Sequence, residues 1–150
     1  MIDVNNRSHL EAFIALNEAW ISKYFTLEEA DIRLASNPGQ VIDNGGYIFS
    51  LAEDNRVVGV CALFRESAEV FQLARMAVDF EFQGRGYGDV LIRSALSTLE
   101  AIKARKVYLL SNSRLEAAIS LYLKHGFEIV SRGKHPDYSR VDIVMEKCLL

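Results

Sequence analysis

The sequence has few cysteines, no long hydrophobic segment and no strong excess of either charge. Only Cys61 and Cys148 occur, which suits reduced thiols better than a disulfide framework. Charged residues interrupt every apolar stretch before it could span a bilayer, and the N-terminus lacks a basic segment followed by an apolar one. We therefore expect a cytoplasmic protein with no membrane-spanning segment and no export signal.

The charge balance and the histidines exclude two further classes of protein. With 25% charged residues and a formal net charge of -3, the chain has neither the composition of a disordered segment nor the excess positive charge of a nucleic-acid-binding protein. His9, His125 and His135 are scattered and lack metal-ligand spacing with the cysteines. We predict no nucleic-acid partner and no metal site.

What the chain does have is apolar sequence, enough for one core. Half of its 150 residues are hydrophobic, which suits a single domain over residues 1–150. Ser8 and Glu11 have the spacing of a capping box, and apolar residues recur at helical spacing from Leu10 to Tyr24. A second capping signal at 26–29 opens a short helix that ends at 37–39. Two helices are thus expected before any strand.

Strand patterns dominate the rest of the chain. Alternating or continuous apolar runs predict strands over 47–52, 57–64, 69–78, 106–110, 127–130 and 141–145, with a turn at 133–137 before the last. One helix follows the glycines at 84–88, and another ends at Gly126, which is placed to adopt a left-handed conformation. This order predicts a mixed α/β sheet with helices on both faces and a functional crevice at the carboxyl ends of its parallel strands.

A glycine-rich turn follows the third predicted strand. Gln83-Gly84-Arg85-Gly86-Tyr87-Gly88 leads from that strand into a helix. Glycines allow backbone N–H groups to converge, and the helix N-terminus adds partial positive charge, so the turn can bind a phosphate group. Its spacing differs from the dinucleotide and P-loop patterns. The segment therefore predicts an anion-binding site, with Arg85 adding a mobile cation.

The sequence resembles the GNAT superfamily of N-acetyltransferases over nearly its whole length. Residues 83–88 match the family's Q/R-x-x-G-x-G/A loop, and residues 118–127 match a second A-x-x-L-Y-x-x-x-G-F pattern. The resemblance implies a mostly antiparallel sheet with a central parallel strand pair. It also implies acetyl-CoA as acyl donor and transfer of an acetyl group to a primary amine of a small molecule or peptide.

Site residues follow from this resemblance. Backbone groups of Met76, Ala77 and Val78 would pair with the pantetheine arm, and the loop amides from Gln83 to Gly88 would bind the pyrophosphate. Asn112 and Tyr122 would approach the thiol end. A tyrosine, with a reference pKa of about 10, stays protonated at neutral pH and can protonate the departing thiolate. Tyr122 is therefore the candidate acid.

The general base is less well marked. Some family members carry a glutamate where this chain has Gln72, and an amide cannot accept a proton near neutral pH. Glu69 and Glu81 are possible substitutes. Leu115 stands where many relatives have asparagine, which removes one expected side-chain contact to the cofactor.

The resemblance places the first helices and the second strand over the acceptor. Aromatic residues there could line its pocket, namely Trp20, Tyr24, Phe25 and Tyr47. Arg75 could meet an acidic substrate, and Gln72 lies on the same strand. Near the last strand, Arg140 and Asp142 are expected to pair with each other.

Two other functions stay open at this stage. The chain could be a non-catalytic acyl-CoA-binding or sensing domain that lost its base, which Gln72 supports. A nucleotide-binding module is disfavoured by the glycine spacing and the second motif. Homodimerisation is plausible for a small enzyme of this kind.

Overall fold

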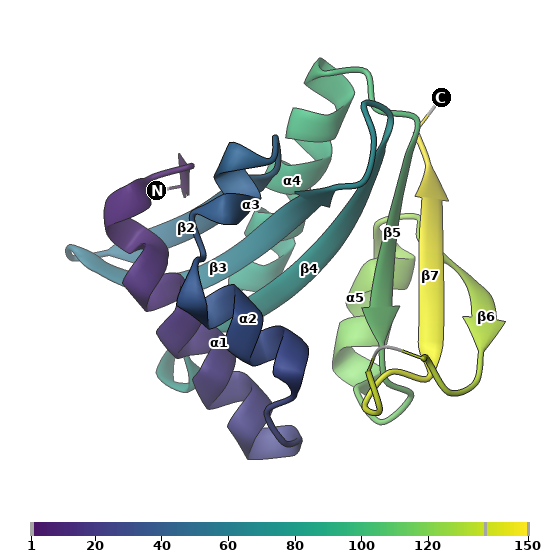
Figure 1. Cartoon of the computed structure of the whole chain (residues 1–150), viewed down its shortest axis with the longest axis horizontal. Coiled ribbons are helices and arrows are strands. Elements are labelled where there is room, and N and C mark those ends of the chain that lie inside the picture. The colour runs from purple at the N-terminus through teal and green to yellow at the C-terminus, as the bar shows by residue number, and fades with distance from the viewer. Residues whose placement is uncertain (1, 137, 150) are drawn as a thin grey trace.

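The computed structural model describes residues 2–136 and 138–149 as one α/β unit (Figure 1). In chain order the elements are β1 (Ile2–Val4), η1 (Arg7–His9), α1 (Leu10–Tyr24), α2 (Glu29–Ser36), α3 (Gln40–Asp43), β2 (Tyr47–Glu53), β3 (Arg56–Arg65), β4 (Val70–Val78), η2 (Phe80–Phe82), α4 (Tyr87–Ala101), β5 (Lys106–Ser111), α5 (Glu116–Lys124), β6 (Glu128–Arg132) and β7 (Ile143–Cys148). Asp137, in the predicted turn at 133–137, lies outside the described residues.

The strands form one seven-stranded sheet in the order β1-β2-β3-β4-β5-β7-β6. All neighbouring strands are antiparallel except β4 and β5, which run parallel. The predicted mostly antiparallel sheet with a central parallel pair is therefore confirmed.

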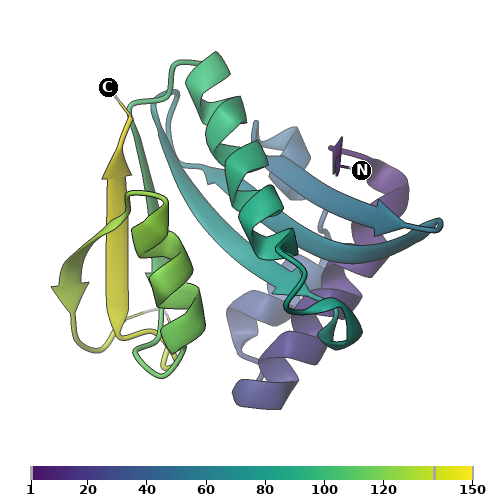
Figure 2. The same cartoon turned by 180° about the vertical axis from the view of Figure 1, so that it is seen from behind.

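Helices cover both faces of the sheet, as predicted. α1, α2 and α3 lie on one face (Figure 1), and α4 and α5 lie on the other (Figure 2). The core is divided accordingly, because neighbouring residues of a strand point to opposite faces. Ile48 packs in a cluster with Phe13 of α1, whereas Phe49 packs in a larger cluster with Leu91 and Leu99 of α4.

The N-terminal third departs from the sequence prediction. A strand, β1, precedes the first helix, and α3 adds a third helix before β2. The predicted caps were also wrong: Asn6, rather than Ser8, accepts the backbone N–H at the first helical turn, and α2 begins at a capping box of Glu28 and Asp31, two residues after Thr26. Short carboxylate and amide side chains compete with serine and threonine for this role.

Backbone conformation demands particular residues at two chain reversals, one of which, at Gly126, was predicted. Asp54 and Asn55 both have positive φ, 50° and 64°, as the tight hairpin between β2 and β3 requires. Gly126 ends α5 with φ 90°. Phe127 then packs its ring 6.0 Å from that of Tyr122, which closes the helix end against the sheet.

The parallel strands diverge soon after they begin to pair. β4 and β5 pair only over 70–72 and 106–108, although β4 continues to Val78 and β5 to Ser111. A register shift between β3 and β4 coincides with Arg75, whose φ of 60° is left-handed, so β4 bends there. Beyond the last paired residues the two halves of the sheet separate (Figure 1).

None of the described helices is long and apolar enough to cross a bilayer.

Candidate active site

A cleft of about 600 Å³ occupies the space between the diverging strands. It lies at the carboxyl end of β4, where the strand order places the crevice of an α/β sheet. Its walls come from α1, β4, the glycine-rich loop, the segment after β5, α5 and the segment before β7. Most of the predicted site residues line it: Trp20, Tyr24, Gln72, Arg75, Met76, Ala77, Val78, Gln83, Gly84, Gly86, Tyr87, Gly88, Asn112 and Tyr122.

The glycine-rich loop leaves open space where a ligand's backbone contacts would form. Gly84 and Gly86 have φ of 79° and 80°, and a Cβ added to either would meet no atom within 4 Å. Gly86 is the N-cap of α4, so the free N–H groups of the first helical turn begin here. The loop thus fits an anionic group such as a pyrophosphate, with the helix dipole favouring negative charge.

Side chains fix the first turn of α4 relative to α5. A Cβ on Gly88 would lie 3.2 Å from Leu121, so the two helices approach closely at this point. Asp89 accepts hydrogen bonds from His125 at 2.7 Å and Lys124 at 3.1 Å. Those bonds hold the pKa of the Asp89 carboxyl below its ordinary value. The contact joins the N-terminal end of α4 to the C-terminal end of α5, which suits both helix dipoles.

Arg85 is the one predicted cofactor residue whose side chain does not line the cleft. It is exposed, lies 3.9 Å from Glu53 and stacks its guanidinium 4.7 Å from the Phe82 ring. Tyr87 donates a hydrogen bond to the same glutamate, which raises the pKa of the phenol. The cation of the loop is thus directed toward Glu53, and toward the cleft the loop presents backbone groups.

Asn112 organises the segment that follows β5. Its Nδ2 donates to the carbonyl of Arg140 at 2.8 Å, and its Oδ1 accepts from the backbone N–H of Arg114 at 2.9 Å. The side chain is only 9% exposed. With both ends of the amide engaged, Asn112 holds two loops at the cleft mouth. Leu115, which stands where many relatives have asparagine, also lines the cleft.

Tyr122 places a phenol in the cleft wall. Its ring packs against Phe127, and its hydroxyl makes no hydrogen bond with any of the residues described. Burial raises the pKa of this phenol above its ordinary value. The group therefore stays protonated throughout the physiological range and is available as a donor.

Gln72 lines the cleft at the position where a base was sought, and neither suggested substitute does. Its Oε1 lies 3.4 Å from the Tyr108 hydroxyl at the last paired position of β4 and β5. Glu69 pairs with Arg105 and Glu81 with Arg56, each at 3.5 Å and outside the cleft. Within the described residues, Glu116 is the one carboxylate lining the cleft.

The wall expected to face the acceptor is aromatic. Trp20 and Tyr24 line the cleft with ring centroids 5.1 Å apart, and Phe25 continues this wall. Tyr47 does not reach it: its ring packs against Phe49 and Phe71, in the cluster beneath α4. Alternation along β2 explains this placement, since Tyr47 shares a face with Phe49.

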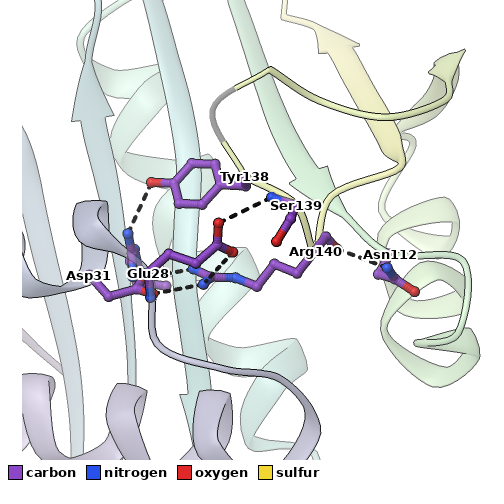
Figure 3. A network of polar contacts seen from close by, with 7 residues as sticks. Glu28, Asp31, Asn112, Tyr138, Ser139 and Arg140 are labelled. Carbon is purple, nitrogen blue, oxygen red and sulfur yellow. Dashed lines mark hydrogen bonds and ion pairs between the residues drawn. The ribbon is translucent and has the colours of Figure 1, made fainter.

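A buried ion-pair network lies beside the cleft, which Arg75, Tyr138 and Arg140 line (Figure 3). Asp31 of α2, 4% exposed, accepts from Arg75 of the β4 bend and, in a bidentate pair at 2.7 Å, from Arg140. Arg140 also contacts Glu28 at 3.2 Å, and Arg75 donates to the Tyr138 hydroxyl at 3.1 Å. The network ties α2 to the segment before β7.

Electrostatics of this network favour the charged forms. Burial acts to raise the pKa of Asp31, but hydrogen bonds from Arg140, the Glu28 backbone and Arg75 bring it down to about 2. Burial likewise acts to lower the pKa of Arg140, and its bonds to Asp31 raise it overall. The expected Arg140–Asp142 pair was wrong: Asp142 instead accepts from the backbone and hydroxyl of Ser113, both at 2.8 Å.

Three residues of this region had no signal in the sequence. Asp31 sits in a helix with ordinary amphipathic spacing, and its partners are 44 and 109 positions away. Arg114 lines the cleft with its guanidinium 4.9 Å over the Phe25 ring. Asn17, 5% exposed, also lines the cleft.

Within the described residues, no group of three or more His, Cys, Asp or Glu could hold a metal ion.

The fold and the cleft together define an α/β protein with an anion-binding loop beside the free edge of a diverging strand, a combination suited to acyl-CoA. Residues 44–129 match the family model described as an acetyltransferase (GNAT) domain. The chain therefore belongs to the GNAT acetyltransferase family, whose members carry out acyl-CoA-dependent acyl transfer.

Solved structures share the fold at low sequence identity. An acetyltransferase of the GNAT family from Staphylococcus aureus Mu50 superposes with a TM-score of 0.85 at 19% identity, covering 100% of both chains. An acetyltransferase from Streptococcus agalactiae 2603 gives 0.81 at 19%, covering 99% of this chain and 98% of its own. The PaiA N-acetyltransferase of Thermoplasma acidophilum, in complex with coenzyme A, gives 0.76 at 18%, covering 99% of both. A search of curated sequences found no match.

Proposed function

We propose that this chain is an acetyl-CoA-dependent N-acetyltransferase that transfers an acetyl group to a primary amine of a small molecule or peptide. The observation that carries the proposal is the convergence of three features in one cleft: the open loop at Gly84 and Gly86, the free edge of β4 and the unpartnered phenol of Tyr122. The thioester donor and the amine would meet in this cleft.

The donor would be held mostly by backbone groups. Residues 83–88 would bind its pyrophosphate, and the edge of β4 from Met76 to Val78 would pair with the pantetheine arm, since this stretch has no strand partner on the β5 side. Acetyl-CoA supplies a thioester whose thiol is a good leaving group. Phe82 and Leu121 add apolar walls to the same part of the cleft.

Direct attack by the amine fits the nucleophiles available. Cys61 is buried, and burial raises the pKa of its thiol to about 12, so it is a poor acyl carrier. Cys148 lies at the end of β7 and does not line the cleft. The proposed reaction therefore needs no covalent enzyme intermediate. Tyr122 would protonate the departing thiolate.

The environment of the bound amine would lower its pKa and so favour the neutral form that attacks. An ordinary alkyl ammonium with a pKa of about 10.4 costs roughly 4.6 kcal/mol to deprotonate at pH 7. Loss of solvent around an amine bound beside Trp20, Tyr24 and Phe25 would favour its neutral form, with the proton passing to solvent water before the attack. This effect replaces part of what a glutamate at position 72 would supply.

A screen of amines with acetyl-CoA, following thiol release, tests the proposal. Turnover with any acceptor supports it. CoA binding without turnover across a broad panel of small amines and peptide N-termini would favour the alternative, a non-catalytic acyl-CoA-binding or sensing domain, for which Gln72 is the specific support. The cytoplasmic location and the homodimer stay predictions.

A further inference from the structure

A smaller cavity adjoins the acceptor side of the cleft. Its volume is about 310 Å³, and it lies between the α1–α2 linker, the segment after β5 and the segment before β7. The lining residues are Tyr24, Phe25, Thr26, Glu28, Asn112, Arg114, Ser139 and Arg140. Tyr24, Phe25, Asn112, Arg114 and Arg140 line both spaces, so an acceptor in the cleft can extend into this cavity.

The charges around this cavity do not cancel. Arg75 and Arg140 share Asp31, and Arg140 also contacts Glu28, so two carboxylates balance these two guanidinium groups (Figure 3). Arg114 forms no ion pair with any residue the structure describes. Glu116, the carboxylate of the main cleft, does not line the smaller cavity. Among the described residues, one positive charge without a partnering carboxylate therefore remains, on Arg114.

Arg114 is held in place while its donors stay free. Its backbone N–H is bonded to Asn112 Oδ1 at 2.9 Å, and its guanidinium lies over the Phe25 ring. The guanidinium itself donates no hydrogen bond to the described part of the chain. A planar guanidinium stacked on an aromatic ring presents paired N–H groups that match a carboxylate. The Thr26 and Ser139 hydroxyls on the same walls can add further donors.

We propose that this cavity binds a carboxylate of the acceptor through Arg114, which makes the acceptor an amine that also carries a carboxylate, such as an amino acid. The inference rests on the proposed function, because the amine must reach the cleft. One positive charge balances a singly charged carboxylate. A doubly charged phosphate would leave excess negative charge beside Glu28.

Matched acceptors test this subsite. The panel pairs each amino acid with its amide: a straight-chain series from glycine to aminohexanoic acid, and phenylalanine as an aromatic member. Phosphoethanolamine is added as the phosphate-bearing amine. Both kcat/KM with acetyl-CoA and thermal stabilisation of the CoA complex by each acceptor are measured, so binding is read independently of turnover.

We expect at least one acid to be preferred over its amide by about tenfold or more, and phosphoethanolamine to be used no better than an uncharged amine. Arg114→Gln should bring the acid-to-amide ratio near one, and Arg114→Lys should keep part of it. Arg132→Gln, on exposed β6, removes the same charge outside the cleft and should leave the ratio unchanged.

Three results would overturn the subsite: equal use and equal binding of every acid and its amide, a preference that survives in Arg114→Gln, or a preference for phosphoethanolamine. Equal turnover of every acid and its amide, with CoA binding intact, would do so while leaving the N-acetyltransferase proposal standing. Absence of CoA binding would instead reject the proposed function itself.

Discussion

At the scale of single residues, the Tyr122 hydroxyl tests the chemistry most directly. Tyr122→Phe should lower kcat by roughly 10²–10⁴-fold, because the proton donor is lost while the ring still packs on Phe127. The dissociation constant of acetyl-CoA should change little. Pre-steady-state and steady-state rates with the best acceptor measure this.

Tyr47→Phe is the matched control for that substitution. It removes the same atom from a ring that packs on Phe49 and Phe71 outside the cleft. Its kcat should stay near that of the parent. If chemistry limits the rate and Tyr122→Phe keeps full kcat, the proton-donor role is wrong and Tyr122 serves packing.

The loop glycines give a second prediction at this scale. Gly86→Ala places a methyl group in the open space of the proposed phosphate site and strains a φ of 80°. CoA affinity measured by calorimetry should fall at least about tenfold. Gly133→Ala, at a φ of 126° and also with open surroundings, imposes strain without touching the cleft. Equal CoA affinity in the parent and both variants would move the site elsewhere.

At the scale of elements, the link between α2 and the segment before β7 depends on Asp31. Asp31→Asn leaves two partly buried guanidinium groups undercompensated and should lower the free energy of unfolding by about 3 kcal/mol. Asp43→Asn breaks an exposed pair with Arg7 and should cost about 0–1 kcal/mol. Urea denaturation measures both. Similar losses in the two variants would contradict a buried network.

Acid titration provides an independent check on the same carboxylate. The pKa of Asp31 is lowered from 3.8 to about 2, so its stabilisation is complete above pH 3.8 and is lost as the pH falls toward about 2. The loss should amount to roughly 2 kcal/mol, because a proton bound more weakly in the folded state favours unfolding in acid. Asp31→Asn should lack this part of the acid transition.

Elements with a strong local pattern were predictable from the sequence, and those without one were not. Apolar periodicity in the sequence predicts strands β2 to β7 and helix α4. Gly126 was predictable because the chain adopts a left-handed conformation at the end of α5, which favours glycine. β1 spans three residues and α3 four, which is too short for any period to register. The β4 bend at Arg75 has no local signal, because arginine gains nothing intrinsically from a positive φ.

The candidate site divides along the same line. The glycine-rich loop and Tyr122 could be selected from the sequence because each belongs to a motif of closely spaced residues. Asp31, Arg114 and Asn17 were missed because their places depend on contacts between distant segments. Tyr47 was assigned to the acceptor side because its strand borders that region, whereas its own side chain points to the opposite face.

At the scale of the whole molecule, ligand binding should appear as stability. CoA or acetyl-CoA at 100 times its dissociation constant should add about 2.7 kcal/mol to the free energy of unfolding. ATP and NAD at equal concentration should stabilise weakly, because they lack a pantetheine arm to pair with the edge of β4. Thermal scans compare the three, and equal shifts for all of them would reject a CoA-specific cleft.

The divergence of β4 and β5 also has a consequence for aggregation and for amide exchange. An unpaired strand edge is ordinarily a template for association with another chain, and proteins protect such edges. Here the edge faces a cleft whose other walls include α5 and residues of the Asp31 network, so we expect these walls to hinder the approach of a foreign strand. The same backbone groups exchange hydrogen with water until a ligand pairs with them. We therefore expect solvent, and not a neighbouring strand, to hydrogen-bond the edge of β4 whenever no ligand is bound, and CoA to slow amide exchange there.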